Sequence, residues 1–141
     1  MVERAGVVLL LVVATAVVAL IVRARARACA AAMEGQVLPA ALRSEFGADT
    51  PGVVYFYGPH CGSCRQQAAI LDQLAGREPV TILKLDAVEQ TELAGTFGIA
   101  TLPATVVIAP GGTVQTVNLG LRSLPVLAAQ LHQARDTRAA A

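Results

Sequence analysis

The amino-acid sequence predicts an α/β domain that follows an N-terminal transmembrane helix. Three observations lead to this fold class. Residues 5–22 carry no charge, strand-like runs alternate with helical patterns in the remainder of the chain, and a Cys-x-x-Cys motif follows one of these runs. A chain of 141 residues has room for about one such domain.

A stretch of apolar residues near the N-terminus predicts a helix that crosses a membrane. Residues 5–22, AGVVLLLVVATAVVALIV, would rise about 27 Å as a helix, close to the thickness of the hydrocarbon layer. A cleaved signal peptide is the alternative, but the arginines of RARARACAAA follow where secretion signals avoid positive charge. Cys29 lacks the preceding apolar residue of a bacterial lipobox, so we expect it to be unmodified. We therefore expect an uncleaved anchor over residues 1–23.

The segment after the span, residues 24–36, is rich in Ala and Arg and predicts a helical stalk or linker. Both residue types are strong helix formers, so we expect the membrane helix to continue until Glu34 and Gly35 end it. Only Arg4 precedes the span while three arginines follow it, which favours a single-pass protein in the cell membrane with its domain on the cytoplasmic side. The extracytoplasmic side remains the alternative.

The domain itself is expected over residues 37–135, with its first strand at residues 52–57. GVVYFY is apolar on both faces, as is typical of a central strand in a buried sheet. A helix is expected to follow the cysteines and to end at Gly76. Its apolar residues at helical spacing are Ala68, Leu71, Leu74 and Ala75. A strand that leads directly into a helix is typical of an α/β unit.

A second strand and a short helix are expected next. VTILKLD, residues 80–86, has the composition of a strand. In EQTELAGTFG, residues 89–98, Leu93 and Phe97 stand one helical turn apart and Gly98 closes the segment. The alternation of strand and helix therefore continues through the middle of the chain.

The C-terminal part predicts a hairpin and a last helix. ATVVIA and TVQTVNL, residues 104–109 and 113–119, flank PGG and should pair as antiparallel strands. The last helix is expected to start after Ser123 as its N-cap, with Pro125 in the first turn. Its buried residues are expected to be Leu127 and Leu131. Residues 136–141 are expected to form a frayed tail.

The cysteines of the motif are placed where a thiolate is stabilised. Cys61 lies at the end of the strand and Cys64 in the first turn of the helix, where free backbone amides and the helix dipole favour an anion. The thiolate is the nucleophilic form of cysteine, and side chains one turn apart are close enough to form a disulfide. Gly62 and Ser63 between them are small and uncharged, which allows a substrate chain to approach. The pattern predicts that Cys61 attacks and Cys64 resolves.

Two other interpretations of the cysteine pair remain open at this point. A zinc site needs four ligands, and outside the pair only Cys29, His60 and His132 offer a thiolate or an imidazole, so no metal is expected. A purely structural disulfide is the second alternative. A Cys-x-x-Cys motif after a strand in an α/β pattern favours a catalytic dithiol, with no cofactor other than the redox-active Cys61–Cys64 disulfide.

The chain resembles the thioredoxin superfamily over this domain. The resemblance rests on YFYGPHCGSC, ILDQLA, KLD and FGIATLPATVVI. It implies a thioredoxin fold, a central mixed sheet flanked by helices, and a membrane-anchored protein disulfide oxidoreductase. It also implies a cis bond between Leu102 and Pro103, with the Leu102 backbone pairing with a substrate peptide beside Cys61.

Two of the departures from the family pattern bear on the chemistry of the cysteines. His60 replaces the tryptophan before the first cysteine, where it either supports the thiolate as a cation or is an exposed loop residue. Tyr55 stands where thioredoxins commonly keep a buried acid, and tyrosine cannot serve as a base near neutral pH. Proton transfer at Cys64 would then depend on water or on Lys84, whose alternative role is a solvated lysine at the end of a strand.

The sequence therefore favours a thiol-disulfide oxidoreductase that reduces or exchanges protein disulfides through a mixed disulfide. Its expected partners are disulfide or dithiol proteins, an electron-donating reductase and, through residues 5–22, the membrane. After Met33 the chain has seven basic and nine acidic residues, a balance that gives no indication of nucleic-acid binding. The alternatives are a non-catalytic thioredoxin-like binding or assembly module at the membrane and delivery of Cu(I) by the dithiol.

Overall fold

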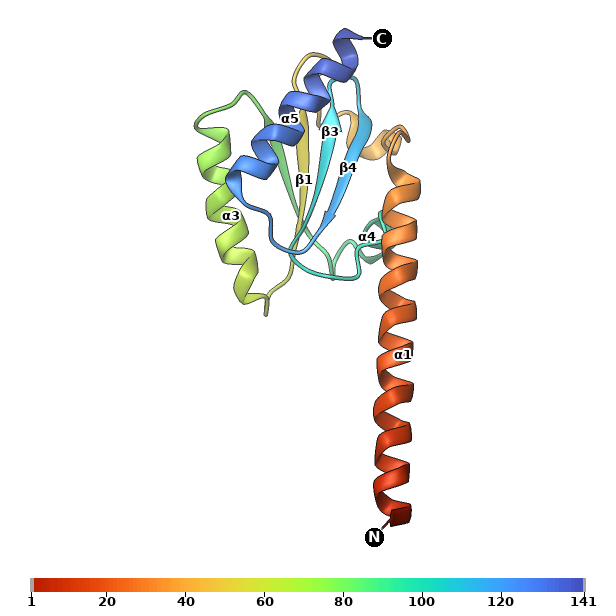
Figure 1. Ribbon diagram of the computed structural model, residues 1–141. Coiled ribbons are helices and arrows are strands. Elements are labelled where there is room, and N and C mark those ends of the chain that lie inside the picture. Colours follow the sequence, from red (N-terminus) through yellow and green to blue (C-terminus); the bar gives the residue numbers. More distant parts are fainter. Residues whose placement is uncertain (1, 141) are drawn as a thin grey trace.

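The first element of the computed structural model, which describes residues 2–140, is the long helix α1, Val2–Met33 (Figure 1). Its segment Arg4–Met33 is long and apolar enough to cross a membrane, with a mean hydropathy of 3.1 in its most apolar window. By length and composition, a helix of this kind near the N-terminus could be a membrane anchor or a signal sequence. The helix runs unbroken through the Ala/Arg-rich segment, as its composition predicts, and Gly35 follows its end with a φ of 82°.

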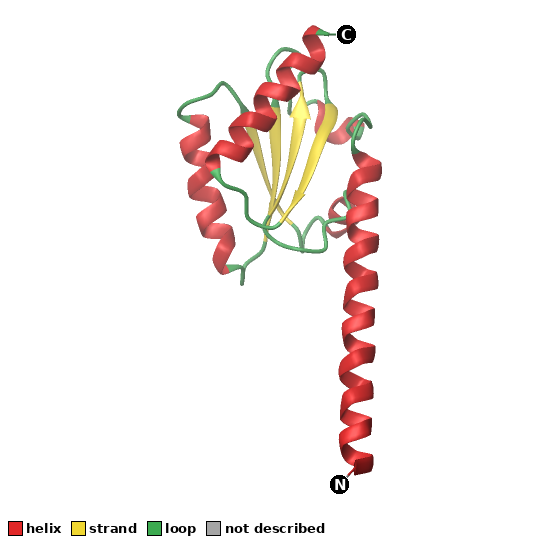
Figure 2. Ribbon diagram, viewed as in Figure 1, coloured by secondary structure: helices red, strands yellow, loops and turns green. Residues whose placement is uncertain are grey.

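A four-stranded mixed sheet forms the centre of the domain, in the strand order β2-β1-β3-β4 (Figure 2). The strands are β1, Gly52–Tyr57; β2, Thr81–Asp86; β3, Ala104–Ala109; and β4, Thr113–Leu119. Strand β1 pairs in parallel with β2 and antiparallel with β3, and β3 pairs antiparallel with β4. The predicted central strand and the predicted hairpin are confirmed.

Helices cover both faces of the sheet, as Figure 1 shows. They are α2, Ala40–Arg43; α3, Gly62–Ala75; α4, Thr91–Thr96; and α5, Leu124–Ala139. Helices α3 and α5 pack on the face of the sheet to which Val53 and Tyr55 point, while Phe46 and Phe97 pack on the face of Val54 and Phe56. Strand β1 is therefore buried on both sides, which is why its sequence is apolar without interruption.

The last helix starts where the sequence predicts and ends later than expected. It begins after Ser123 and buries Leu127 and Leu131, as expected, but the Ser123 side chain makes no capping hydrogen bond. A frayed tail was expected over residues 136–141, but the helix continues to Ala139, and residue 141 lies outside the described residues. In this last part of the helix Arg138 contacts the rest of the domain, where its guanidinium donates to the exposed Asp49 carboxylate at 2.7 Å.

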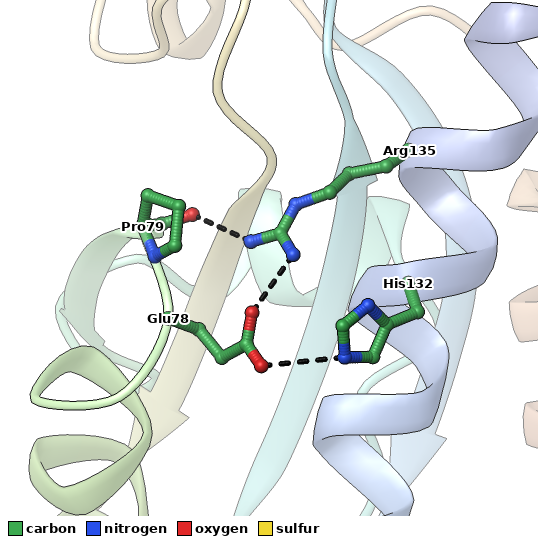
Figure 3. A network of polar contacts seen from close by, with 4 residues as sticks. All are labelled: Glu78, Pro79, His132 and Arg135. Carbon is green, nitrogen blue, oxygen red and sulfur yellow. Dashed lines mark hydrogen bonds and ion pairs between the residues drawn. The ribbon is translucent and has the colours of Figure 1, made fainter.

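A small ion-pair network joins the turn after α3 to helix α5 (Figure 3). Arg135 donates to the Glu78 carboxylate at 2.8 Å and to the Pro79 carbonyl at 3.0 Å. The His132 Nε2 lies 3.3 Å from the other carboxylate oxygen of Glu78. The pKa of Glu78 is lowered, mainly by the hydrogen bond from Arg135. Burial opposes this shift, and the charges of His132 and Arg135 add smaller lowering contributions.

This network predicts that Glu78→Gln changes how the stability of the fold depends on pH in the acidic range. A carboxyl whose folded pKa lies below its usual 4.5 stabilises the fold above that pH and loses the effect as the pH falls through the lowered value. The variant should therefore unfold at a lower temperature than wild type at pH 7, and the difference should shrink below pH 4.5. Thermal unfolding of the full chain in detergent, followed by circular dichroism, measures this. Glu45→Gln, at an exposed position, is the matched control, and an equal pH trend for both variants would contradict the assignment.

Candidate functional site

The two cysteines of the motif lie where β1 passes into α3. Cys61 is the N-cap residue of α3, with φ −100° and ψ 102°, and Cys64 lies in the first turn of that helix. The two form a disulfide with a Cα–Cα distance of 5.3 Å. Their position at a helix N-terminus places unpaired backbone amides and the positive end of the helix dipole next to the sulfur atoms.

The two sulfur atoms differ in their access to solvent. Cys61 is partly exposed, whereas Cys64 is only 4% exposed and packs with the core on the α3 side of the sheet. The Ser63 Oγ lies 3.7 Å from the Cys61 Sγ, a distance at which the hydroxyl can donate to a sulfur anion. Cys61 is therefore accessible enough to attack a disulfide of another protein, whereas the shielded Cys64 is placed to attack the Cys61 sulfur.

Tyr55 occupies the buried position beneath the cysteines. It is 2% exposed, and its hydroxyl donates to the Cys64 backbone carbonyl at 2.6 Å. Burial raises the pKa of Tyr55, with a further contribution from neighbouring Tyr57, whose ring centroid lies 5.8 Å away. The phenol thus stays protonated near neutral pH and serves as a hydrogen-bond donor to the first turn of α3, so it cannot take a proton from Cys64.

The loop before β3 lies beside the cysteines. The Leu102–Pro103 peptide bond is cis, as the family resemblance implies. Ala104 pairs with Phe56, so Pro103 stands level with the end of β1. A Cβ atom on Gly58 would lie only 2.9 Å from the Leu102 side chain, which shows how closely the two loops approach. The structure thus brings Leu102 and Pro103 next to the turn that carries Cys61.

An open hollow of about 710 Å³ lies beside the disulfide, and three of the predicted supporting residues, His60, Gly62 and Lys84, line it. His60 is exposed on its rim. Lys84 also lines it, but its ammonium pairs with Asp72 at 3.1 Å on the surface, as expected of a solvated lysine. Arg65, in the first turn of α3, lines the same hollow. Among residues 2–140, no group of three His, Cys, Asp or Glu side chains is placed to hold a metal ion.

Gln67 is a structural residue of the site that sequence reasoning missed. It is fully buried, accepts from the Arg122 backbone N–H at 2.7 Å and donates to the Arg122 carbonyl at 3.2 Å. These bonds tie α3 to the loop after β4. The helical spacing indicated that Gln67 is buried, because it lies on the same face of the helix as three buried residues. These are Cys64, Leu71 and Leu74.

Comparisons with known proteins agree on one family. The family described as "Thioredoxin" matches residues 37–133. Thioredoxin of Bacillus subtilis strain 168 is 36% identical over 76 residues, which cover 50% of this chain and 73% of that protein. Thioredoxin of Alicyclobacillus acidocaldarius is 34% identical over 85 residues, 59% of this chain and 80% of that protein. A mutant thioredoxin from Halobacterium salinarum NRC-1 superposes with a TM-score of 0.61 at 21% identity, over 70% of this chain and 86% of that one.

The hydrogen bond of Tyr55 gives a testable prediction for the site. Tyr55→Phe removes the donor to Cys64 and should lower the free energy of unfolding by about 1 kcal/mol. Because the phenol stays protonated, the pH dependence of thiol-disulfide exchange between pH 6 and about 9 should not change. Denaturant unfolding and stopped-flow exchange with a small aromatic disulfide measure the two quantities. A shifted pH profile in Tyr55→Phe would show instead that the phenol takes part in proton transfer.

Proposed function

This chain belongs to the thioredoxin family, and from that premise we propose that it is a membrane-anchored thiol-disulfide oxidoreductase. It has the thioredoxin fold, a mixed four-stranded sheet flanked by helices, behind a long apolar helix. Its Cys-x-x-Cys disulfide is consistent with disulfide oxidoreductase activity. The observation that carries the proposal is the placement of this disulfide at the start of α3, with Cys61 accessible and Cys64 shielded.

In the proposed reaction the reduced protein transfers two electrons to a protein disulfide. The Cys61 thiolate attacks one substrate sulfur, forms a mixed disulfide and releases the other substrate sulfur as a thiolate, which takes up a proton. Cys64 then loses its proton and attacks the Cys61 sulfur. The bond to the substrate breaks, the substrate leaves as a dithiol, and the Cys61–Cys64 disulfide forms. A reductase that supplies a dithiol restores the reduced state.

Neighbouring groups assist these steps in the proposed mechanism. The backbone amides at the start of α3 and the Ser63 hydroxyl stabilise the Cys61 thiolate, and Gly62 leaves room for the substrate chain. The Leu102 backbone, next to Pro103, pairs with the substrate peptide. Since Tyr55 is no base and the Lys84 ammonium is engaged with Asp72, the proton of Cys64 passes to water in the open hollow.

The location is part of the same proposal. Helix α1 anchors the chain in the cell membrane through residues 5–22, and the arginines after the span keep the domain on the cytoplasmic side. A soluble reductase can reach it there. An extracytoplasmic domain would need a membrane electron carrier instead, so the side of the membrane decides the class of electron donor.

We expect the two cysteines to give different defects when each is changed to serine. Cys61→Ser should reduce turnover with insulin to the uncatalysed rate, whereas Cys64→Ser should stop at the mixed disulfide and accumulate a covalent adduct with the substrate. Cys29→Ala, at an exposed thiol outside the site, is the matched control and should keep wild-type turnover. If Cys61 is alkylated at neutral pH no faster than an unactivated thiol, the chain is a binding module rather than an oxidoreductase.

The proposed orientation predicts protection of Cys61 in intact cells. In a Cys29→Ala, Cys64→Ser variant, Cys61 is the remaining cysteine, and a membrane-impermeant maleimide should label it only after lysis. Labelling in intact cells would place the domain outside the cytoplasm. The total labelled in lysed cells serves as the reference in both cases.

A further inference from the structure

We propose that the redox site faces the membrane surface, so that its substrate is a cysteine pair in a juxtamembrane segment of an integral membrane protein. This inference rests on the proposed anchoring and dithiol function. It deepens them by naming the class of substrate. Four features of the structure carry it: the end of the sheet at which the site lies, the attachment of α1 to the domain, the height of the loop before Pro103, and the lateral position of β1.

The site lies at the end of the sheet toward which the membrane span runs. Phe56 pairs with Ala104, and Ala104 with Leu119, so the carboxyl ends of β1 and β4 lie at the same end as the cysteines. Helix α1 runs alongside β4 (Figure 1). The Gly35 amide, just after α1, donates to the Val114 carbonyl near the start of β4. Leu119, at the end of β4, lines a hollow with residues that lie earlier in α1. Followed from Met33 back toward the span, α1 therefore approaches the end of the sheet that carries the redox site.

The segment expected to be a stalk is packed against the domain. A Cβ atom on Gly98 would lie 2.9 Å from the Cys29 Cβ and 3.0 Å from the backbone of both Ala26 and Ala30, so the loop after α4 touches the helix backbone. Ala30 is buried, and the Glu34 carboxylate accepts from the Val117 amide at 3.4 Å. We call residues 26–33 the docked end of α1. Because α1 is one continuous helix, this contact fixes the direction of the domain relative to the span.

The docked end begins close to the membrane boundary. Ala26 lies four residues after Val22, the last residue of the apolar run, which is about 6 Å along a helix. Ala100 and Thr101, the residues just before Leu102, line one hollow of about 740 Å³ together with Val22. That hollow follows α1 from Ala19 to Glu34, and Gly98, just before this loop, contacts Ala26. The loop that leads to Pro103 therefore lies alongside the part of α1 that adjoins the end of the span.

The lateral position of the site leaves room for a second membrane helix. Strand β1 is two strands away from β4, about 10 Å across the sheet, and α1 lies beyond β4. A helix with its side chains is about 10 Å wide. A partner helix can thus stand beside α1 beneath the site and present cysteines to Cys61 as soon as it leaves the bilayer. The electron balance is that of the proposed reaction: the partner's disulfide is reduced to a dithiol, and Cys61 and Cys64 are oxidised.

A depth measurement tests the geometry without relying on activity. The full chain is placed in lipid vesicles as the Cys29→Ala, Cys64→Ser double variant, with a fluorophore attached to Cys61. Quenching of its fluorescence by lipids that carry a nitroxide on the headgroup is then recorded. The control places the same fluorophore at Arg77→Cys in a chain without its three native cysteines; Arg77 is exposed at the other end of α3, about 20 Å away. We expect several-fold stronger quenching at position 61. Equal quenching at both positions, or stronger quenching at 77, would overturn the inference.

A matched variant moves the site away from the membrane while keeping the fold. Seven alanines inserted between Arg23 and Ala24 add about two helical turns, lift the domain by about 10 Å and leave the docked end unchanged. Quenching at position 61 should fall toward that at position 77. Turnover of soluble insulin should stay at the wild-type rate. If the insertion leaves the quenching at position 61 unchanged, α1 does not set the height of the site.

Two reporters then test the substrate class in the same vesicles. Each is a single-span helix with a disulfide, either directly after its apolar segment or two helical turns further out. Wild type should reduce the near reporter several-fold faster, and the seven-alanine variant should reverse this preference. Equal rates for both reporters, with normal insulin turnover, would overturn this inference alone. A failure to reduce any of the three disulfides, or to associate with vesicles, would overturn the proposed function itself.

Discussion

The burial of β1 on both faces is the constraint on which the rest of the structure depends. Its side chains alternate between two cores, so the strand must lie inside the sheet with helices on either side. That position fixes where its carboxyl end emerges and thus where α3 can begin. The same pairing with β3 sets Pro103 level with this end. A single strand thus places both the accessible cysteine and the loop that faces it.

Tyr55 changes the environment of the cysteines relative to the family pattern. In the family pattern a buried acid stands under the second cysteine, and here Tyr55 fills the space and bonds to the Cys64 carbonyl. The hydrogen bond holds the first turn of α3 but supplies no proton acceptor. In the proposed mechanism, water in the open hollow accepts the proton of Cys64 instead. Compared with the family pattern, Tyr55 adds a hydrogen bond that holds the start of α3 and leaves the site without a buried carboxylate to act as a base.

Local patterns in the sequence predict most of this fold, because they depend on neighbouring residues alone. Alternating apolar runs, the Pro-Gly-Gly turn and Gly98 determine strands, hairpin and helix end with little help from distant contacts. Gln67 was missed because its partner, Arg122, is 55 residues away and polar side chains on a helix usually face water. The docked end of α1 was missed for a related reason. Alanines in a helix indicate helix formation equally well whether they touch solvent or a glycine of another loop, and only the tertiary fold brings Gly98 there.

In the proposed anchored protein, the continuity of α1 also makes the direction that the domain faces in the plane of the bilayer depend on the number of residues between the span and the domain. One residue added or removed between Val22 and Ala26 would shift the domain by only about 1.5 Å along the helix axis but swing it by about 100° around that axis. Cys61 would then point to a different neighbour in the plane of the bilayer while the fold and the dithiol stayed the same. Small changes in the length of this short segment are thus a simple route by which related chains can acquire different partners.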